Sequence, residues 1–451
     1  MKCQFFIAAT VALLFVLGSP FGSARAEAGE NFPLTLFDIY QMARDGDPNI
    51  AIARFRVDGA EAERDIARGK NFPQVSLFGD WSRNKINYEG DTLSRLPSQN
   101  YAGERYGLQL RSPIFNIRNV REYERQRALV GKSEEELAVA ETELLARVVE
   151  AYLTVLLTEE SVMQVESELS ALERQLDEAN ALYAKSLLPI TQVLETQSRT
   201  DSLRADVFNA RGQAAIARER LTQLVGIRDL ALQPIADRMT LLTSVRDAQS
   251  AAELALEFDP ATDAAENALQ AAKKGVDREK GSWLPEIDFV YNSQFSDVGF
   301  DNLTSPPRYT QSYSISMRYP LFEGGAGSAR LRSAWAEYYS AQQQLEAAKR
   351  EASGRARSAW VNLESATERV QATRQAVITA ETNLDASRKA VKAGTAKVTD
   401  VLVALAQNTR AQRDLTEARF QRAMGWLELE LATGSDPSLL APRLSSALHG
   451  L

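Results

Sequence analysis

Short segments of the chain alternate apolar and polar residues with the period of two that predicts β-strands having one apolar and one polar face. Two such segments follow Pro73 and two follow Pro285. Their apolar members are Val75, Leu77, Trp81, Tyr106, Leu108 and Leu110, and then Ile287, Phe289, Tyr291, Tyr313, Ile315, Met317 and Tyr319. Polar stretches at residues 84–105 and 293–311 separate the paired segments and predict exposed loops. The pattern therefore predicts four strands.

Long α-helices are predicted after each pair of strands. The stretch from Ile117 to Ala184 has no proline and one glycine, so a single helix of 68 residues would be about 100 Å long. Apolar residues recur along it at alternating intervals of three and four, which is the seam of a coiled coil. The seam residues are Val162, Val165, Leu169, Leu172, Leu176, Ala179 and Tyr183, and their counterparts 208 residues later are Val370, Thr373, Val377, Ala380, Leu384, Ser387 and Val391. Small residues at Ala352, Ala356, Ala359 and Ala366 predict closely packed helices in the second half.

Paired motifs show that the chain is internally duplicated. Asp47-Pro48 recurs as Asp259-Pro260, and Pro73 recurs as Pro285, both at an offset of 212 residues. Later matches have similar offsets, and they pair Pro113-Ile114-Phe115 with Pro320-Leu321-Phe322, Val193-Leu194 with Val401-Leu402, and Gly226 with Gly434. We expect a first repeat at residues 27–226, a connecting equatorial segment at 227–258, a second repeat at 259–434 and a C-terminal tail at 435–451.

The N-terminal segment has the features of a secretory signal peptide. Lys2 precedes an apolar run from Phe5 to Leu17, and Ala24-Arg25-Ala26 has the small-x-small pattern of a signal-peptidase site. We expect cleavage after Ala26, so that residues 1–26 are removed. The run is too short to span a bilayer comfortably, and no later stretch approaches the roughly 20 apolar residues of a transmembrane helix.

Charge and cysteine content narrow the class of protein further. The only cysteine, Cys3, lies in the signal peptide, so the mature chain is expected to have no disulfide and no cysteine-based metal site. The full chain has 52 basic and 60 acidic residues, a net charge of −8, and removal of Lys2 and Arg25 makes it more negative. This acidity disfavours nucleic acid as a partner.

Four amphipathic strands cannot enclose a lumen by themselves. In a membrane every backbone polar group must be paired, so a membrane sheet would have to close with strands from several chains. The segments suit a transmembrane barrel in length and alternation, and Trp81, Tyr106, Trp283, Tyr313 and Tyr319 suit interface anchors. A soluble sandwich with one wet face is the alternative. The signal peptide and the long helices favour the barrel.

In this order, the motifs resemble those of the TolC-like outer-membrane efflux and secretion proteins. The resemblance covers nearly the whole mature chain, and it includes the two Asp-Pro helices, the Pro-Ile-Phe and Pro-Leu-Phe-Glu-Gly-Gly junctions, and Ala393-Gly394-Thr395 leading to Thr399-Asp400-Val401-Leu402. It implies a mainly α fold with membrane β-strands, in which each chain contributes four strands to a trimeric 12-stranded outer-membrane β-barrel. Long coiled-coil helices would form a periplasmic α-barrel.

The resemblance also implies partners and a localisation. The chain would be a homotrimer in the outer membrane, in contact with lipid and extending into the periplasm. Its partners would be a periplasmic adaptor (membrane-fusion) protein and an inner-membrane ABC or proton-driven transporter. Substrate would pass through passively, and the sequence does not separate a secreted protein from small toxic compounds as cargo.

The resemblance places the inner entrance of the tunnel at the turns between paired helices, residues 185–192 and 393–400. Asp400 matches an acidic position that, repeated by threefold symmetry, would form an anionic ring favouring cations. The alternative is a turn aspartate that caps the following helix. Pore-entrance candidates are Asp400, Gln192, Ala396 and Lys397, and candidates for adaptor docking are Lys185, Ser186, Gly394 and Thr395.

The entrance departs from the family pattern at several positions. Some members have a second acidic ring where this chain has Val403. They also hold the tip shut with an aspartate, an arginine and a tyrosine, which match Gln192, Ala396 and Val391 here. This latch is therefore not reproduced. Lys185, Lys392 and Lys397 lie nearby in sequence, where they could dock an adaptor or simply form a solvated basic tip.

Residues capable of catalysis are scarce in this sequence. His449 is the only histidine and has no cysteine to pair with, which excludes histidine-based triads and ordinary zinc sites. Gly324-Gly325-Ala326-Gly327 is glycine-rich but lacks the Lys-Ser/Thr pair of a phosphate loop, so a strand-to-helix hinge is expected. The sequence thus predicts no catalytic, cofactor or metal site. Besides a channel, a periplasmic coiled-coil adaptor or scaffold without a pore remains an alternative, and a secreted enzyme is the third.

Overall fold

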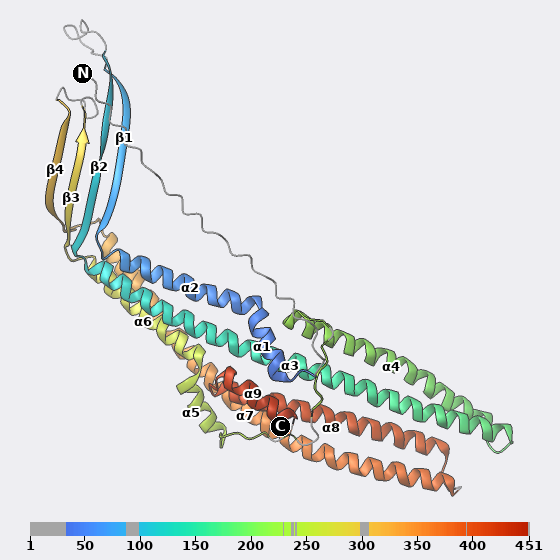
Figure 1. Cartoon of the computed structure of the whole chain (residues 1–451). Coiled ribbons are helices and arrows are strands. Elements are labelled where there is room, and N and C mark those ends of the chain that lie inside the picture. The colour runs from blue at the N-terminus through green and yellow to red at the C-terminus, as the bar shows by residue number, and fades with distance from the viewer. Residues whose placement is uncertain are drawn as a thin grey trace.

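The computed structural model describes residues 33–86, 99–228, 230–235, 239, 241–297, 306–393 and 395–449. A sheet stands at one end of an elongated molecule, and long helices run from it to the opposite end (Figure 1). The expected signal peptide, residues 1–26, lies outside the described residues.

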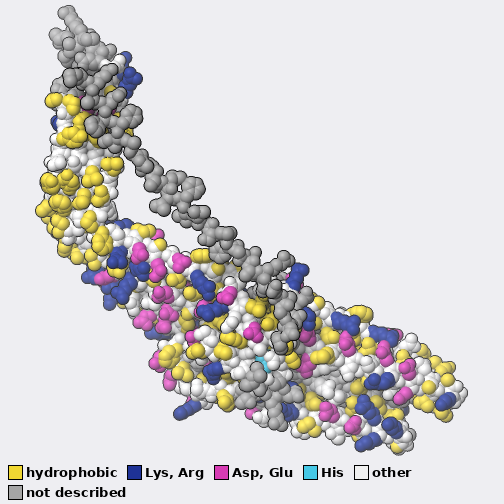
Figure 2. Space-filling view, viewed as in Figure 1, with side chains coloured by type: hydrophobic (Ala, Val, Ile, Leu, Met, Phe, Trp, Pro, Cys, Tyr) yellow, Lys and Arg dark blue, Asp and Glu magenta, His cyan; other side chains and the backbone are white. Residues whose placement is uncertain are grey.

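Within the described residues, one antiparallel sheet contains strands β1 (Gln74–Ile86), β2 (Gln99–Phe115), β3 (Glu286–Ser296) and β4 (Arg308–Arg318), in the order β1-β2-β3-β4. Directly paired residues share a face, and Leu77 pairs with Leu108, Tyr291 with Tyr313 and Phe289 with Ile315. Apolar side chains thus gather on one face, as the alternation predicted, and Figure 2 shows them clustered over the sheet. Arg105 and Asp80 form an ion pair of 3.0 Å on the opposite, polar face. The prediction of four two-faced strands is confirmed.

The predicted loops were too long. Residues 84–86 and 99–105 belong to β1 and β2, where Asn84 pairs with Tyr101, and residues 293–296 and 308–311 belong to β3 and β4. The strands continue through polar residues because the ladder is made by backbone groups, whatever the side chains are. Polar composition alone therefore overestimated the loops.

The helices reproduce the duplication. The first half contains α1 (Leu36–Gly46), α2 (Pro48–Gly69), α3 (Ile117–Ala184) and α4 (Ile190–Val225), the second half contains α5 (Ala248–Phe258), α6 (Pro260–Gly281), α7 (Ala326–Lys392) and α8 (Val398–Ala432), and α9 (Pro437–His449) follows. Helix α5 repeats α1 at an offset of 212, so the structural repeat extends into the segment 227–258 that was expected to be a connection. The division of the chain at residues 226, 258 and 434 stays a prediction.

Each Asp-Pro motif begins a helix and fixes it to a long neighbour. Asp47 accepts a hydrogen bond of 2.7 Å from the backbone N–H of Asn49, and its other carboxylate oxygen lies 2.9 Å from Arg147 of α3. Asp259 also caps its helix, accepting a hydrogen bond of 3.1 Å from the backbone N–H of Thr262, and lies 3.2 Å from Arg355 of α7. Both aspartates are buried, and a buried carboxylate requires such partners. The same cap and ion pair therefore orient α2 on α3 and α6 on α7.

The predicted seams lie in the helical core. Val165 and Leu172 of α3 are buried against Leu203 and Val207 of α4, with Leu402 of α8 beside them. In the second half the small residues pack closely, and Ala352 and Ala356 are buried against α5. Tyr183, the last residue of the first seam, is an exception because it is exposed.

The largest apolar cluster lies midway along the helices and joins α1, α3, α8 and α9. Leu440, Leu444 and Leu448 of α9 are buried there, so residues 437–449 form a packed helix rather than a loose tail. Tyr152 is fully buried and donates a hydrogen bond of 2.8 Å to the carbonyl oxygen of Gln233. This cluster anchors the connection between the halves to the long helices.

Glu168 of α3 provides a test of the helical packing. Its side chain is buried, one carboxylate oxygen has no hydrogen-bond partner, and Arg413 lies 3.6 Å away. Burial raises the pKa of Glu168, an effect that Arg413 opposes. The folded state therefore binds a proton more tightly than the unfolded chain, so stability falls as the pH rises through the raised pKa.

We expect Glu168→Gln to raise the unfolding temperature by a few degrees at neutral pH, since it removes a buried charge. The gain should shrink as the pH is lowered toward the raised pKa of Glu168, because the wild-type side chain then also loses its charge. Thermal unfolding followed by circular dichroism at both pH values measures it. Glu166→Gln is the matched control, because Glu166 is exposed and pairs with Arg211 at 2.7 Å. A gain that is equal at both pH values would contradict the assignment.

Candidate functional site

The candidate site is the tip where the paired helices turn, at the end of the molecule opposite to the sheet (Figure 1). The first turn joins α3 to α4. Lys185 follows the last residue of α3 as its C-cap, and Ser186 has φ 62°, the only positive φ of a non-glycine residue in the described part of the chain. The turn is closed by the N–H of Leu187, which donates to the carbonyl oxygen of Leu182 at 2.9 Å. Lys185 and Ser186 are both exposed, so both can be reached by a partner.

The second turn joins α7 to α8. The backbone N–H and the hydroxyl of Thr395 both donate to the carbonyl oxygen of Ala390, at 2.9 and 3.0 Å, which satisfies the end of α7. Thr395 and Lys397 are exposed and Ala396 is half-buried. Gly394, another of the expected docking residues, lies outside the described residues.

Asp400 lies in the first turn of α8. Its carboxylate accepts a hydrogen bond of 2.9 Å from the backbone N–H of Lys397, which satisfies one of the free donors at the helix start. A negative charge there is also favoured by the helix dipole. The capping role considered from the sequence is thus present. Because the side chain is also exposed, capping leaves the carboxylate free to act on ions.

The remaining entrance residues are not arranged as a latch within the described chain. Gln192 is half-buried in the first turn of α4, where its carbonyl oxygen accepts a hydrogen bond of 2.8 Å from the Thr196 hydroxyl. Ala396 and Val391 carry no polar group, and Val403 is 58% exposed. Side chains that could join one turn to the other are therefore missing at these positions.

A groove between α4 and α8 was missed by the sequence analysis. It has a volume of about 1030 Å³ and begins near the tip. Charged side chains of both signs line it, including Glu195, Arg199 and Asp206 on α4 and Arg410, Arg413 and Glu417 on α8. Their helical spacing is visible in the sequence. Only the folded chain shows that the two charged faces stand opposite each other.

The described residues offer little else for chemistry. No group of three or more histidine, cysteine, aspartate or glutamate side chains among them could hold a metal ion. His449 contacts the carbonyl oxygen of Pro234 at 3.1 Å, and burial lowers its pKa, so it is part of the packing around α9. Among the described helices, none combines the length and apolar character needed to cross a membrane.

Comparison with known proteins agrees with this geometry. The family model described as outer membrane efflux protein matches residues 39–227 and 251–435. The proteases secretion protein PrtF of Dickeya chrysanthemi is 24% identical over 434 residues, which cover 94% of this chain and 92% of that protein. The outer membrane protein TolC of Vibrio cholerae is 25% identical and covers 89% of this chain and 90% of its own length.

Solved structures show the same fold. The channel CusC superposes with a TM-score of 0.78 at 17% identity, covering 91% of this chain and 95% of its own. The outer membrane protein VceC of Vibrio cholerae has a TM-score of 0.75 at 20% identity, covering 88% and 96%. These likenesses confirm the predicted fold class. With a family model that matches both halves, the chain belongs to the outer membrane efflux protein family and is an outer-membrane channel protein whose helices extend into the periplasm.

Proposed function

We propose that three copies of this chain form one conduit of an export system that spans the cell envelope. The observation that carries the proposal is the sheet, with one apolar face, one polar face and unpaired outer edges on β1 and β4 in the described chain. In lipid these edges must find backbone partners. Three copies of four strands would close a 12-stranded barrel with its polar face toward the lumen.

The helices continue the conduit across the periplasm as an α-barrel. Helices α3 and α7 contain 68 and 67 residues, so each is about 100 Å long. Substrate moves through passively, and the energy comes from an inner-membrane ABC or proton-driven transporter coupled through a periplasmic adaptor. PrtF is named a proteases secretion protein, which supports a secreted protein as one cargo, with small toxic compounds as the other. The cargo is chosen upstream of this chain.

The chain itself catalyses no reaction in this proposal. Its single histidine is held in the packing around α9, and the charged groups at the tip are solvated or paired along helices. The sheet argues against the adaptor or scaffold alternative, because a scaffold has no need of a face with Leu77 83% exposed and Ile315 71% exposed. Such a face is expected to meet lipid.

The channel reading predicts a trimer in outer-membrane fractions. It should migrate as a large species in detergent gels when unheated and as a monomer after boiling, because the closed barrel resists detergent until it is melted. Cell fractionation followed by heated and unheated electrophoresis measures this. Recovery of the folded protein as a soluble periplasmic species would refute the channel and support a scaffold.

At the entrance, Asp400 is proposed to form an anionic ring in the trimer. We expect Asp400→Asn to lower cation selectivity, seen as a smaller reversal potential across a salt gradient in single-channel recordings. Asn can still accept the hydrogen bond from the N–H of Lys397, so this variant separates charge from capping. Asp400→Glu is the control and should keep the selectivity. Unchanged cation selectivity in Asp400→Asn would contradict the proposed anionic ring.

The exposed turns are proposed to dock the adaptor through Lys185, Ser186, Gly394 and Thr395, with the mixed-charge groove beside them continuing the contact. We expect cysteines introduced by Ser186→Cys and Thr395→Cys to be joined to the adaptor by a short lysine-reactive thiol cross-linker in intact cells. Lys273→Cys, at an exposed residue of α6 far from the tip, is the control. Immunoblotting against the adaptor identifies the product. Equal capture from Lys273→Cys would count against docking at the turns.

A further inference from the structure

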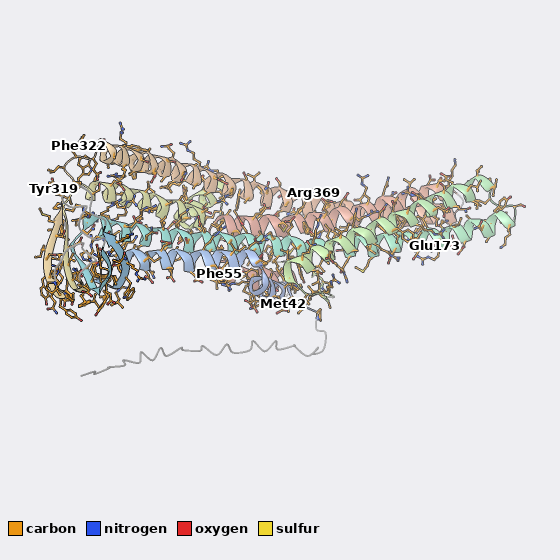
Figure 3. All side chains as sticks on the ribbon, turned by 90° about the horizontal axis from the view of Figure 1, so that it is seen from above. Met42, Phe55, Glu173, Tyr319, Phe322 and Arg369 are labelled. Atoms are coloured by element: carbon orange, nitrogen blue, oxygen red, sulfur yellow. The ribbon has the colours of Figure 1, made fainter. Side chains whose placement is uncertain are left out.

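Two helix faces are uncovered in a single chain, although the equivalent faces in the other repeat are packed against a neighbouring helix. In the described chain α2 packs on α3, α3 on α6 and α6 on α7. Figure 3 shows α2 with Phe55 along one outer edge and α7 with Arg369 along the other. Helices α2 and α6 occupy equivalent places in the two repeats, and so do α3 and α7. The contact between α3 and α6 therefore has an equivalent contact, which a single chain cannot make. That equivalent is α7 of one copy against α2 of the next.

The outer face of α2 has an apolar stripe. Ile52, Phe55 and Ile66 are 49%, 71% and 54% exposed, and Gly59 and Ala62 lie between them at helical spacing. Their counterparts 212 residues later face α3, and none of these is exposed: they are Ala264, Asn267, Ala271, Lys274 and Arg278. The stripe therefore occupies positions that are covered in the other repeat, yet it is bare in a single chain.

The opposing face can be identified on α7 residue by residue. Both α3 and α7 are continuous helices, so the offset of 208 seen at their seams holds along their length. At the α3–α6 joint, a Cβ on Gly131 would lie 3.2 Å from the side-chain nitrogen of Asn267. The equivalent residues are Tyr339, which is 58% exposed, and Phe55. A small residue against an amide in the chain is thus replaced by two exposed aromatic rings, of which Tyr339 also stacks on Trp335 of its own helix at 5.7 Å between ring centroids.

The lower half of the helices gives the same result independently. Within the chain one contact between α3 and α8 is polar: Glu160 accepts a hydrogen bond of 2.9 Å from the hydroxyl of Thr416, and Gln164 lies beside it. The equivalents are Ala372, in place of Gln164, and Phe208, in place of Thr416. Phe208 of α4 is 70% exposed, and Ala372 and Ala376 of α7 are bare. An aromatic ring again stands opposite a helix that has room for it.

On the long helix, the charge at the joint is reversed in sign between α3 and α7. In the chain, acidic α3 meets basic α6, through Glu124–Lys274 and Glu122–Arg278, both at 2.8 Å. The α3 glutamates correspond to Arg330 and Arg332 on α7. Arg330 already pairs with Glu323 and Glu279 of its own chain, so Arg332 is the arginine that can face a neighbour. The α2 stripe is flanked there by exposed side chains of both signs, among them Asp58, Glu63 and Asp65. Arg332 can pair with one of these carboxylates, whereas Glu124, its equivalent on α3, cannot.

We propose that copies of this chain join along a seam that keeps the register of the internal α3–α6 and α3–α8 joints but replaces their polar contacts with apolar ones. Phe55 of one copy packs on Tyr339 of the next, and Phe208 packs on Ala372 and Ala376. Arg332 faces the acidic side chains beside the α2 stripe. Arginine in place of Glu124 favours a second repeat over a first repeat at this joint, so the halves alternate around the tunnel. This proposal rests on the proposed trimer and specifies its contacts.

Cysteine cross-linking tests the seam, because Cys3 is the only cysteine of the chain and is expected to leave with the signal peptide. The pairs are Phe55→Cys with Tyr339→Cys, and Phe208→Cys with Ala372→Cys. Oxidation in outer membranes should convert most of the protein into covalent dimers and trimers that boiling preserves and a reductant dissolves. Each single cysteine should leave monomers after boiling.

The matched control is Phe55→Cys with Ala347→Cys. Ala347 lies on the same exposed face of α7 eight residues beyond Tyr339, about 12 Å along the helix, which is too far for a disulfide. Linkage of this control, or a heat-modifiable trimer in which neither designed pair links, would overturn the seam while leaving the channel intact. A wild-type chain that forms no trimer would instead refute the proposed function itself.

A second measurement does not depend on introduced thiols. Phe55→Asn with Tyr339→Gly gives the seam the residues of the internal joint, and should lower the temperature at which the trimer dissociates in detergent by at least several degrees. Leu439→Asn, which alters an exposed apolar residue of α9, should leave it unchanged. An equal dissociation temperature for the seam variant and the wild type would contradict the aromatic contact.

Discussion

An unpaired strand edge cannot be left in lipid, and the rest of this architecture follows from that constraint. The described chain supplies a sheet whose outer strands, β1 and β4, end in open backbone donors and acceptors. Among the described residues of a single copy no further strand pairs with either edge, and the helices leave the sheet at one end only (Figure 1). Association is therefore a requirement of the strands, and the helices must be shaped so that the same association also closes a tunnel.

Duplication meets this requirement with few kinds of contact. The buried aspartate of each Asp-Pro motif caps one helix and holds an arginine of a long helix, at Asp47 and again at Asp259. Because the cap fixes where the short helix starts and the ion pair fixes what it lies against, both halves acquire the same cross-section. The same helix packing can then occur between the two halves of one chain and between neighbouring copies.

Much of the fold could be predicted from the sequence. The period of the apolar residues reflects the geometry of strands and helices, and the constant offset between motifs reflects the internal duplication. Alternation gave the strand faces, and the seam at Val165 and Leu172 gave the helical core. Strand ends were missed because backbone pairing at Asn84 ignores side-chain polarity. The Asp47–Arg147 pair was missed because its members are far apart in sequence and each is ordinary alone. At the tip, the turns and the capping by Asp400 could be located, whereas the groove between α4 and α8 needed the folded chain.

If the two halves had the same side chains as well as the same backbone arrangement, any half could join any other and the order of assembly would not be specified. The two joints avoid this by differing in side chains while sharing a backbone arrangement. Glu124 and Arg332 occupy equivalent places on α3 and α7 with opposite charge, and Gly131 and Tyr339 occupy equivalent places with very different volume. Wrong pairings would bring like charges together or leave a ring without space, and such unfavourable contacts discriminate against the wrong partner. The sequence differences between the halves therefore determine which helices pair between copies, while their common fold determines the shape of the assembly.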